Sequence, residues 1–254
     1  MLAIERKNEI LNKLRNEQRV LVSELAAHYG VTEETIRRDL DKLEKEGHAT
    51  KTYGGAIWGN STKTDLSYTI RNKTNVDAKN AIAAIVDTMV EDGDHIMLDD
   101  SSTCLYIAKQ LKEKKNLTVI TNSVEIVMEL ADVDGWTILS TGGRLKPDSL
   151  AFVGHQVQTM LAGYHVDKTF LSCKGLDAQA GVTDSSEAQA LCKQAMMRSA
   201  KQCILCLDSS KFDKVSFLPI TQLDGLQAIV TNARPSDQWT RLFRERNLPC
   251  YYPE

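Results

Sequence analysis

The chain of 254 residues contains no long apolar run, and charged residues lie close to its start. No stretch approaches the roughly 18 apolar residues that a membrane-spanning helix needs. Glu5, Arg6 and Lys7 interrupt the apolar core that a secretion signal would require. We therefore expect a cytoplasmic protein that has no membrane partner.

The six cysteines show no pattern of a disulfide framework, because most of them lie inside apolar stretches. Cys203 and Cys206 have CxxC spacing, but they belong to the apolar run 203–207, which indicates a strand. Residues three apart on a strand face opposite sides, so this spacing does not favour a shared metal ion. We expect buried thiols, with neither a metal site nor a cofactor.

An excess of positive charge is also missing, since the formal net charge is −3. Residues 1–58 carry ten Lys or Arg and ten Asp or Glu. This balance excludes a sequence-independent nucleic-acid coat, and any DNA binding has to depend on where the positive residues lie. What the chain does have is 42% hydrophobic and 26% charged residues, which are ordinary values for a globular protein.

Two helical patterns occupy the first 30 residues. Ser23 precedes the second of them as an expected N-cap, and Gly30 stands where a helix ends in a left-handed residue. The apolar residues of the first helix share one face, and they are Ile4, Ile10, Leu11 and Leu14.

A third helix and a hairpin follow. Thr32 is expected to cap the helix, and Glu33 and Glu34 lie in its first turn, where the helix dipole favours acids. Residues 48–53 and 56–58 predict two short strands around a glycine turn. The apolar face of the third helix consists of Ile36, Leu40 and Leu43. Residues 1–58 are therefore predicted to form a winged helix-turn-helix.

Polar residues project from the N-terminal half of this third helix, which is the part that a recognition helix places in the major groove. Arginine can donate two hydrogen bonds to guanine, and hydroxyl groups can hold phosphates. The open alternatives are that Arg37 and Arg38 only pair with neighbouring acids, and that the hairpin is an ordinary surface. The candidate DNA-binding residues are Ser23, Thr32, Glu33, Thr35, Arg37, Arg38, Lys51 and Tyr53.

Residues 59–75 are polar and are interpreted as a linker. From 76 to 254, apolar strand-like runs alternate with helical patterns, which predicts an α/β domain with a largely parallel sheet. The expected strands are 96–98, 117–121, 136–140, 169–171, 203–207 and 226–231. The expected helices are 103–114, 124–131, 187–200 and 237–247. We expect this domain to sense an effector and to form oligomers.

Polar loops follow three of these strands, and ligands bind beyond the carboxyl ends of strands in open α/β sheets. Hydroxyl groups and helix N-terminal amides suit a phosphate group, although a simple helix cap is the open alternative. The candidates in these loops are Asp100, Ser101, Ser102, Thr103, Asn122, Ser123, Gly143 and Arg144. Further acids and lysines could hold sugar hydroxyls and phosphate or could be solvated surface residues, and they are Lys174, Asp177, Glu187, Lys193 and Lys211.

Several motifs together resemble the DeoR family of bacterial sugar-metabolism regulators over nearly the whole chain. They lie at 31–40, 53–56, 121–123, 142–144, 152–154, 167–168 and 208–212. The resemblance implies a winged helix-turn-helix repressor with a C-terminal domain similar to ribose-5-phosphate isomerase. It also implies oligomers on repeated or palindromic operators, and release of the double-stranded DNA when a phosphorylated sugar binds.

The same resemblance assigns the phosphate-loop role to Asp100–Thr103. It assigns pocket roles more loosely to Asn122, Lys174, Asp177, Glu187, Lys193 and Lys211. Many members have glycine where this chain has Ser101, which leaves the identity of the effector open.

An enzyme is the alternative from another class, either a sugar-phosphate isomerase or a deaminase. Asp99, Asp100, Glu187 or Lys193 could then supply acid and base. Residues 1–58 decide against it, since an isomerase needs no helix-turn-helix. A module that acts only through protein partners would leave the arginines of the third helix unexplained. We predict a non-enzymatic DNA-binding regulator, acting as a dimer or larger because one helix-turn-helix contacts too few base pairs.

Overall fold

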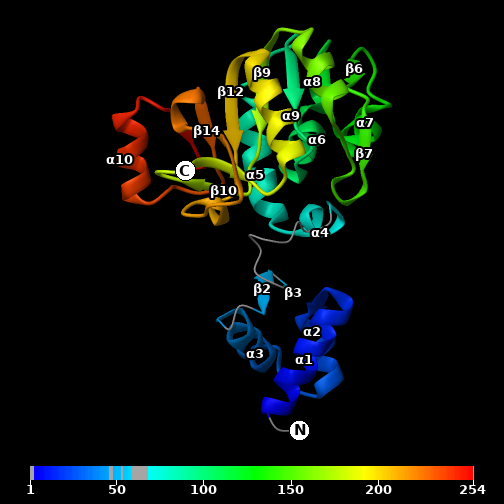
Figure 1. Ribbon diagram of the computed structural model, residues 1–254, viewed down its shortest axis with the longest axis vertical. Coiled ribbons are helices and arrows are strands. Elements are labelled where there is room, and N and C mark those ends of the chain that lie inside the picture. The colour runs from blue at the N-terminus through cyan, green and yellow to red at the C-terminus, as the bar shows by residue number, and fades with distance from the viewer. Residues whose placement is uncertain (1–2, 46–47, 53, 59–67, 254) are drawn as a thin grey trace. The chain divides into compact units, whose positions relative to one another are not determined.

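The computed structural model describes residues 3–45, 48–52, 54–58 and 68–253 (Figure 1). The chain divides into two compact units, Met1–Leu66 and Ser67–Glu254. The predicted linker 59–75 is too long at its C-terminal end, because helix α4 (Tyr68–Lys73) belongs to the second unit. Residues 59–67 of the predicted linker lie outside the described residues. No described helix has the length and apolar character needed to cross a membrane.

The first unit has the predicted winged helix-turn-helix arrangement. Its helices are α1 (Ala3–Glu17), α2 (Val22–Tyr29) and α3 (Glu33–Lys45). Its antiparallel sheet has the order β1-β3-β2, formed by β1 (Arg19–Leu21), β2 (Ala49–Thr52) and β3 (Gly55–Trp58). Strand β1 was not predicted, because three residues are too short for an alternating pattern. The core of the unit includes Ile10, Leu14, Leu25, Ile36, Leu40 and Leu43.

The helix boundaries in this unit confirm two predictions and correct two others. Gly30 ends α2 with a φ of 64°, and the hydroxyl oxygen of Thr32 accepts the N–H of Thr35 at 3.3 Å. The prediction that Ser23 caps α2 is wrong, since α2 begins at Val22, one residue before Ser23, and no side chain caps its start. Ile4 was expected on the buried face of α1 but is 65% exposed, because the first turn extends past the core.

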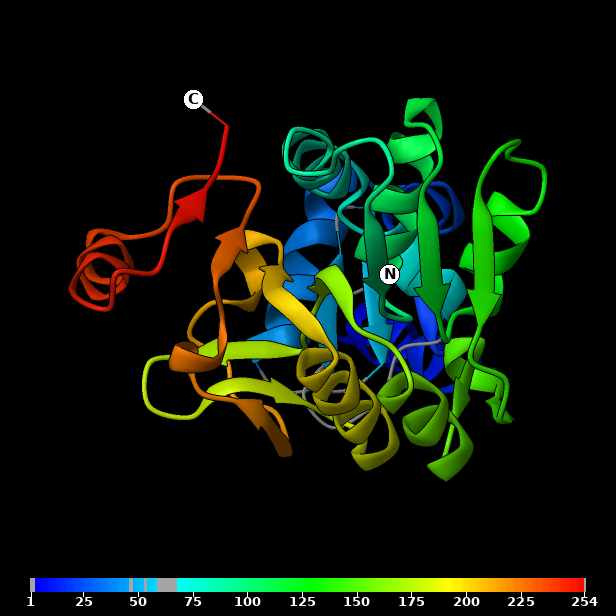
Figure 2. The same ribbon diagram turned by 90° about the horizontal axis from the view of Figure 1, so that it is seen from above.

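The second unit is built around a seven-stranded parallel sheet with the order β15-β14-β12-β9-β4-β5-β6 (Figure 2). The six predicted strands are all present in it. Their bounds are β4 (His95–Leu98), β5 (Thr118–Thr121), β6 (Thr137–Ser140), β9 (Val166–Leu171), β12 (Ala200–Cys206) and β14 (Ala228–Val230), and β15 (Cys250–Tyr251) completes the sheet.

Helices cover both faces of this sheet, as the alternating pattern predicted. The core on one face is formed with α5 (Val76–Asp87), α6 (Ser102–Gln110) and α7 (Val124–Leu130). The core on the other face is formed with α8 (His155–Ala162), α9 (Glu187–Arg198) and α10 (Asp237–Glu245). Single 3-10 turns lie at Leu111–Glu113, Pro147–Ser149, Ser209–Lys211 and Leu223–Gly225.

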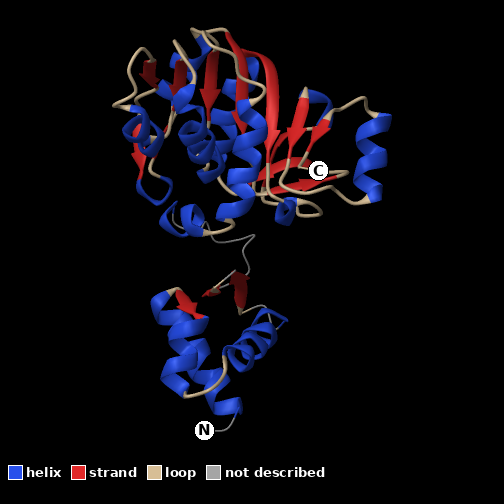
Figure 3. Ribbon diagram, turned by 180° about the vertical axis from the view of Figure 1, so that it is seen from behind, coloured by secondary structure: helices blue, strands red, loops and turns tan. Residues whose placement is uncertain are grey.

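Two smaller sheets extend the loops of the main sheet, and the sequence did not reveal them (Figure 3). A hairpin joins β7 (Arg144–Lys146) to β8 (Ala151–Val153), and a bridge between Ala151 and Ser123 attaches it to the loop after β5. A three-stranded sheet has the order β10-β11-β13, formed by β10 (Gly175–Asp177), β11 (Gly181–Asp184) and β13 (Leu218–Thr221).

The thiols are buried, as expected, with Cys250 half-buried. All six cysteines are free, and Cys203 and Cys206 are core residues on opposite faces of the main sheet. Burial raises the pKa of Cys203 to about 12. Such thiols are protonated at neutral pH and are unsuited to redox or metal chemistry.

Candidate DNA-binding surface and ligand site

Helix α3 has one buried and one exposed face. Arg37 and Arg38 lie on the exposed face, with side chains 44% and 74% exposed. Arg37 Nη2 donates to Oε2 of Glu33 at 3.0 Å, and Arg38 Nε lies 3.4 Å from Oε1 of Glu34. The alternative considered for these arginines, pairing with neighbouring acids, is therefore present in the structure. Exposed pairs of this kind contribute about 1 kcal/mol or less, so a phosphate or a base edge can compete with them.

A buried ion pair fixes α3 against α1. Arg6 Nε donates to Oδ2 of Asp39 at 2.6 Å, and both side chains are less than a tenth exposed. The two residues are 33 positions apart, so their pairing leaves no local signal in the sequence. This contact sets the orientation of the helix that carries the two arginines.

The remaining DNA-binding candidates lie near α3, with two exceptions. The hydroxyls of Thr32 and Thr35 lie 2.9 Å apart at its N-terminus. Lys51, on β2, forms an ion pair with Asp41 of α3. Ser23 is exposed on α2 rather than α3. Tyr53 lies outside the described residues.

The first two polar loops lie at the carboxyl edge of the sheet, where α6 and α7 begin. The Ser101 hydroxyl accepts the N–H of Cys104 at 3.1 Å, and the Ser123 hydroxyl accepts the N–H of Ile126 at 3.3 Å. Both hydroxyls therefore act as helix caps, which was the alternative considered for them. Ser102 and Thr103 are buried in the first turn of α6.

Asp100 is the buried acid of this edge. Gln189 Nε2 donates to Oδ2 of Asp100 at 2.5 Å, and Lys146 Nζ donates to Oε1 of Gln189 at 3.4 Å. Burial raises the pKa of Asp100, while the charge of Lys193 opposes that rise. Neither Gln189 nor Lys146 was predicted. The four-residue spacing of Gln189 and Lys193, which places them on one face of α9, is the signal that could have found Gln189.

Lys193 is the counterion of a buried acidic cluster. Its ammonium donates to Oδ2 of Asp184 at 2.5 Å and to the carbonyl of Ser172 at 2.8 Å, and it lies 3.5 Å from Oδ2 of Asp99. Although burial disfavours its charge, these acids raise the pKa of Lys193. Burial opposes ionisation of Asp184 as well, yet Lys193 holds the pKa of Asp184 below its usual value.

Asn122 ties the loop after β5 to strand β8 and keeps an unused acceptor. Its side-chain Nδ2 donates to the backbone carbonyl of Phe152 at 3.1 Å, and its backbone carbonyl accepts the N–H of Phe152 at 2.8 Å. Its Oδ1 is buried and has no hydrogen-bond partner among the described residues. A buried acceptor without a partner is costly, so this atom is suited to a donor from a ligand.

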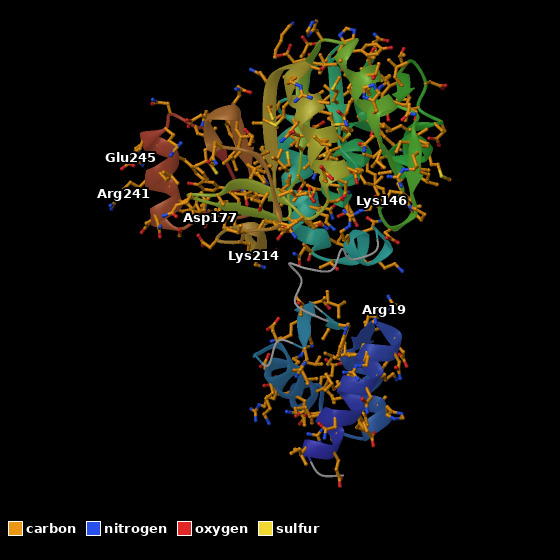
Figure 4. All side chains as sticks on the ribbon, in the orientation of Figure 1. Arg19, Lys146, Asp177, Lys214, Arg241 and Glu245 are labelled. Atoms are coloured by element: carbon orange, nitrogen blue, oxygen red, sulfur yellow. The ribbon has the colours of Figure 1, made fainter. Side chains whose placement is uncertain are left out.

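The other ligand candidates have different surroundings. The charge of Lys174 lowers the pKa of Asp184, and Lys211 lies at the end of the 3-10 turn after β12. Gly143 has a φ of 109°, and a Cβ there would lie 2.8 Å from Val157 Cγ2. The Asp177 carboxylate accepts the N–H groups of its own turn, and the picture places it on the opposite side of the unit from Lys146 (Figure 4).

The structure does not bring every candidate to the buried cluster. Glu187 and Arg144 are exposed. Among the described residues, no hydrogen bond or ion pair joins Asp177, Glu187 or Arg144 to Asp100 and its neighbours. Asp99, Asp184 and Gln189 belong to this cluster but were not among the predicted ligand residues.

Comparison with known proteins agrees with both units. Residues 6–62 match the DeoR-like helix-turn-helix domain, and residues 74–233 match the DeoR C terminal sensor domain. A solved D-ribose-5-phosphate isomerase covers 54% of this chain and 54% of its own length at 16% identity, with a TM-score of 0.39.

Curated relatives match most of the chain. The uncharacterized HTH-type transcriptional regulator YulB of Bacillus subtilis is 42% identical over 92% of this chain and 90% of its own length. The putative aga operon transcriptional repressor of Escherichia coli O157:H7 is 32% identical over 90% of this chain and 86% of its own. These proteins are named as regulators of transcription, which confirms the regulator interpretation over the isomerase or deaminase. Because the sensor domain alone matches more than half of the residues, the chain belongs to the DeoR family of transcriptional regulators.

Proposed function

We propose that this regulator represses a sugar-metabolism operon, and that a phosphorylated sugar bound in its sensor domain releases it from operator DNA. Helix α3 enters the major groove in this proposal, and Arg37 and Arg38 contact bases or phosphates. The support is their exposure on a helix whose other face is buried and whose position is fixed by Arg6 and Asp39. One such helix contacts too few base pairs for specific binding, so the proposal includes a dimer or larger oligomer on symmetric half-sites.

The observation that carries the ligand proposal is the unpartnered Oδ1 of Asn122 at the carboxyl edge of the sheet. It and the Asp100 carboxylate are acceptors, which suit the hydroxyl groups of a sugar. The N-terminus of α6 supplies N–H groups, which suit a phosphate group.

The charge of the cluster favours a sugar phosphate over inorganic phosphate. Three buried acids, Asp99, Asp100 and Asp184, lie around one buried cation, Lys193, while the charges of Lys174 and Arg71 act on the acids from less buried positions. A bare dianion is repelled by such a cluster unless the acids are occupied by hydroxyl donors. A sugar phosphate carries hydroxyl groups for the acids and a phosphate group for the helix N–H groups.

Thermal-shift measurements test this proposal with glucose 6-phosphate, fructose 1-phosphate, ribose 5-phosphate and dihydroxyacetone phosphate. Inorganic phosphate and the unphosphorylated sugars are the controls. We expect one of the four sugar phosphates to stabilise the protein, by about 2.7 kcal/mol at 100 times its Kd. Stabilisation by inorganic phosphate to the same extent, or by none of the four, contradicts the proposal.

Variants at the loops after β4 and β5 test whether the ligand binds there. Ser102→Ala combined with Thr103→Ala, and separately Asn122→Ala, should lose this stabilisation when each variant is compared with its own ligand-free state. Thr137→Ala, at an exposed position of β6, is the matched control and should keep it. Equal ligand affinity in calorimetry for the parent and the first two variants would place the ligand elsewhere.

A further inference from the structure

Helix α4 is the first described element after residues 59–67, through which the chain leaves the DNA-binding unit. It lies at the carboxyl edge of the main sheet, close to the start of α6 (Figure 1). The hydroxyl of Tyr106 in α6 donates to the carbonyl of Asn72 in α4 at 3.2 Å. Tyr106 is four residues after Ser102 and three after Thr103, so one helix carries the proposed ligand contacts and, a turn later, the contact with α4.

A buried lysine caps the C-terminal end of α4. Lys79 Nζ donates to the carbonyls of Arg71 and Thr74, at 2.5 Å in each case. Only 3% of Lys79 is exposed, and its ammonium lies 5.4 Å from the centre of the Tyr106 ring. The last carbonyls of a helix need such donors, so Lys79 holds α4 against α5 and α6.

The turn between α4 and α5 is tied to a second loop of the ligand edge. Asn75 has a φ of 52°, and its Nδ2 donates to Oδ1 of Asp208 at 3.2 Å. Asp208 lies two residues after the end of β12 and caps the 3-10 turn that ends in Lys211. The position of α4 is thus coupled to the loop after β12 as well as to α6.

The charges of α4 and of the ligand cluster also act on one another. Against the effect of burial, the charge of Arg71 in α4 contributes to lowering the pKa of Asp100. A ligand that donates to Asp100 changes the field at Arg71. Hydrogen bonds and charge therefore both link α4 to the carboxyl edge of the main sheet.

We propose that α4 transmits ligand binding from the carboxyl edge to the DNA-binding unit, with Tyr106 and Asn75 as the positioning residues. This inference rests on the proposed function. The ligand binds more tightly to one arrangement of α6 and of the loop after β12, and α4 follows these elements through the two hydrogen bonds. Only such a difference in affinity between two arrangements lets a ligand change DNA binding.

Two conservative variants test the inference. Tyr106→Phe removes the hydroxyl donor and keeps the ring beside Lys79. Asn75→Gly removes the amide and tolerates the positive φ. The probe is the sugar phosphate that stabilises the parent most among the four named above. Calorimetry gives its Kd, and fluorescence anisotropy gives the operator Kd with and without it. Tyr164→Phe, in the loop after α8, is the matched control.

In the parent and in Tyr164→Phe, we expect the probe to weaken operator binding by about 5- to 150-fold. In Tyr106→Phe and Asn75→Gly, we expect this ratio to fall towards one while the Kd of the probe stays within about twofold. An unchanged ratio in both variants overturns the inference and leaves the proposed function standing. A loss of probe binding in the variants also overturns it, since the residues then belong to the ligand site. A parent whose operator binding responds to no probe contradicts the proposed function, and the inference with it.

Discussion

The ammonium group of Lys193 lies 2.5 Å from Oδ2 of Asp184 and 3.5 Å from Oδ2 of Asp99, within the buried part of the sensor domain. All three side chains are at most 6% exposed. The protein itself therefore uses the charge of Lys193, which the sequence had offered as a partner for phosphate. Lys193 is therefore part of the structure of the site, and we propose that N–H groups at the start of α6 hold the phosphate group.

The first prediction concerns this cluster. Lys193→Met leaves Asp184 and Asp99 buried without their counterion, so the free energy of unfolding should fall by about 3 to 5 kcal/mol. Urea denaturation measures it. Lys201→Met is the control, because Lys201 pairs with Asp167 at the surface, where solvent screens the pair, and its loss should be much smaller. A smaller loss for Lys193→Met than for Lys201→Met would show that the cluster is not ion-paired as described.

A second prediction concerns the ion pair that positions α3. Arg6→Met leaves Asp39 buried without a partner, so α1 and α3 should open more often and exchange their amide hydrogens faster. Hydrogen exchange monitors these helices, and the measured operator affinity should fall with them. Lys13→Met serves as the control, since Lys13 lies 4.0 Å from Glu17 on the surface of α1. Unchanged protection of α3 in Arg6→Met is the outcome that excludes this role.

The third prediction is a pH dependence that arises from Lys79. Burial lowers the pKa of Lys79 from 10.5 to about 8. Between these two values the unfolded chain binds more protons than the folded one, so stability should rise with pH across this window. The free energy of unfolding of the parent minus that of Lys79→Met should increase by at most about 1.4 kcal/mol per pH unit. Denaturation at several pH values gives this difference, and a flat or falling difference contradicts the prediction.

A fourth prediction concerns DNA recognition. Replacing Arg37 or Arg38 with alanine should cost about 1 to 3 kcal/mol of operator affinity if that arginine contacts a base. A phosphate contact should instead weaken binding to all sequences and reduce the dependence on salt. Arg241→Ala, at an exposed position of α10 (Figure 4), is the control. Gel-shift titration with unchanged affinity for the folded double variant Arg37→Ala and Arg38→Ala excludes α3 as the recognition helix.

The elements that the sequence predicted are those with a strong local pattern. Buried strands such as β4 and β12 show continuous apolar runs, and α3 shows a 3.6-residue apolar period. The strands that were not predicted have three or four residues each, and their pairing depends on the rest of the fold. They are β1, β7, β8, β10, β11 and β13. The predicted C-terminal end of the linker is wrong for the same reason. Helix α4 is stabilised by Lys79 and Tyr106, which lie in later helices.

The site divides in a similar way. Asp100 and Asn122 were predicted because a position just after a strand is visible in the sequence. Gln189 was missed because its partner Asp100 is 89 residues away, and only the fold brings the two together. The ammonium group of Lys193 pairs with Asp184 and Asp99, and its role toward a ligand stays a prediction.

The most direct test of the account is a fluorescence-anisotropy titration of the unmodified protein on a DNA duplex that it selects from a random-sequence library. The titration is repeated with each of the four sugar phosphates and with inorganic phosphate. The account predicts specific binding that at least one sugar phosphate weakens by about 5- to 150-fold, while inorganic phosphate leaves it unchanged. Selection of no duplex, or a selected duplex whose affinity is the same with all five compounds, would contradict it.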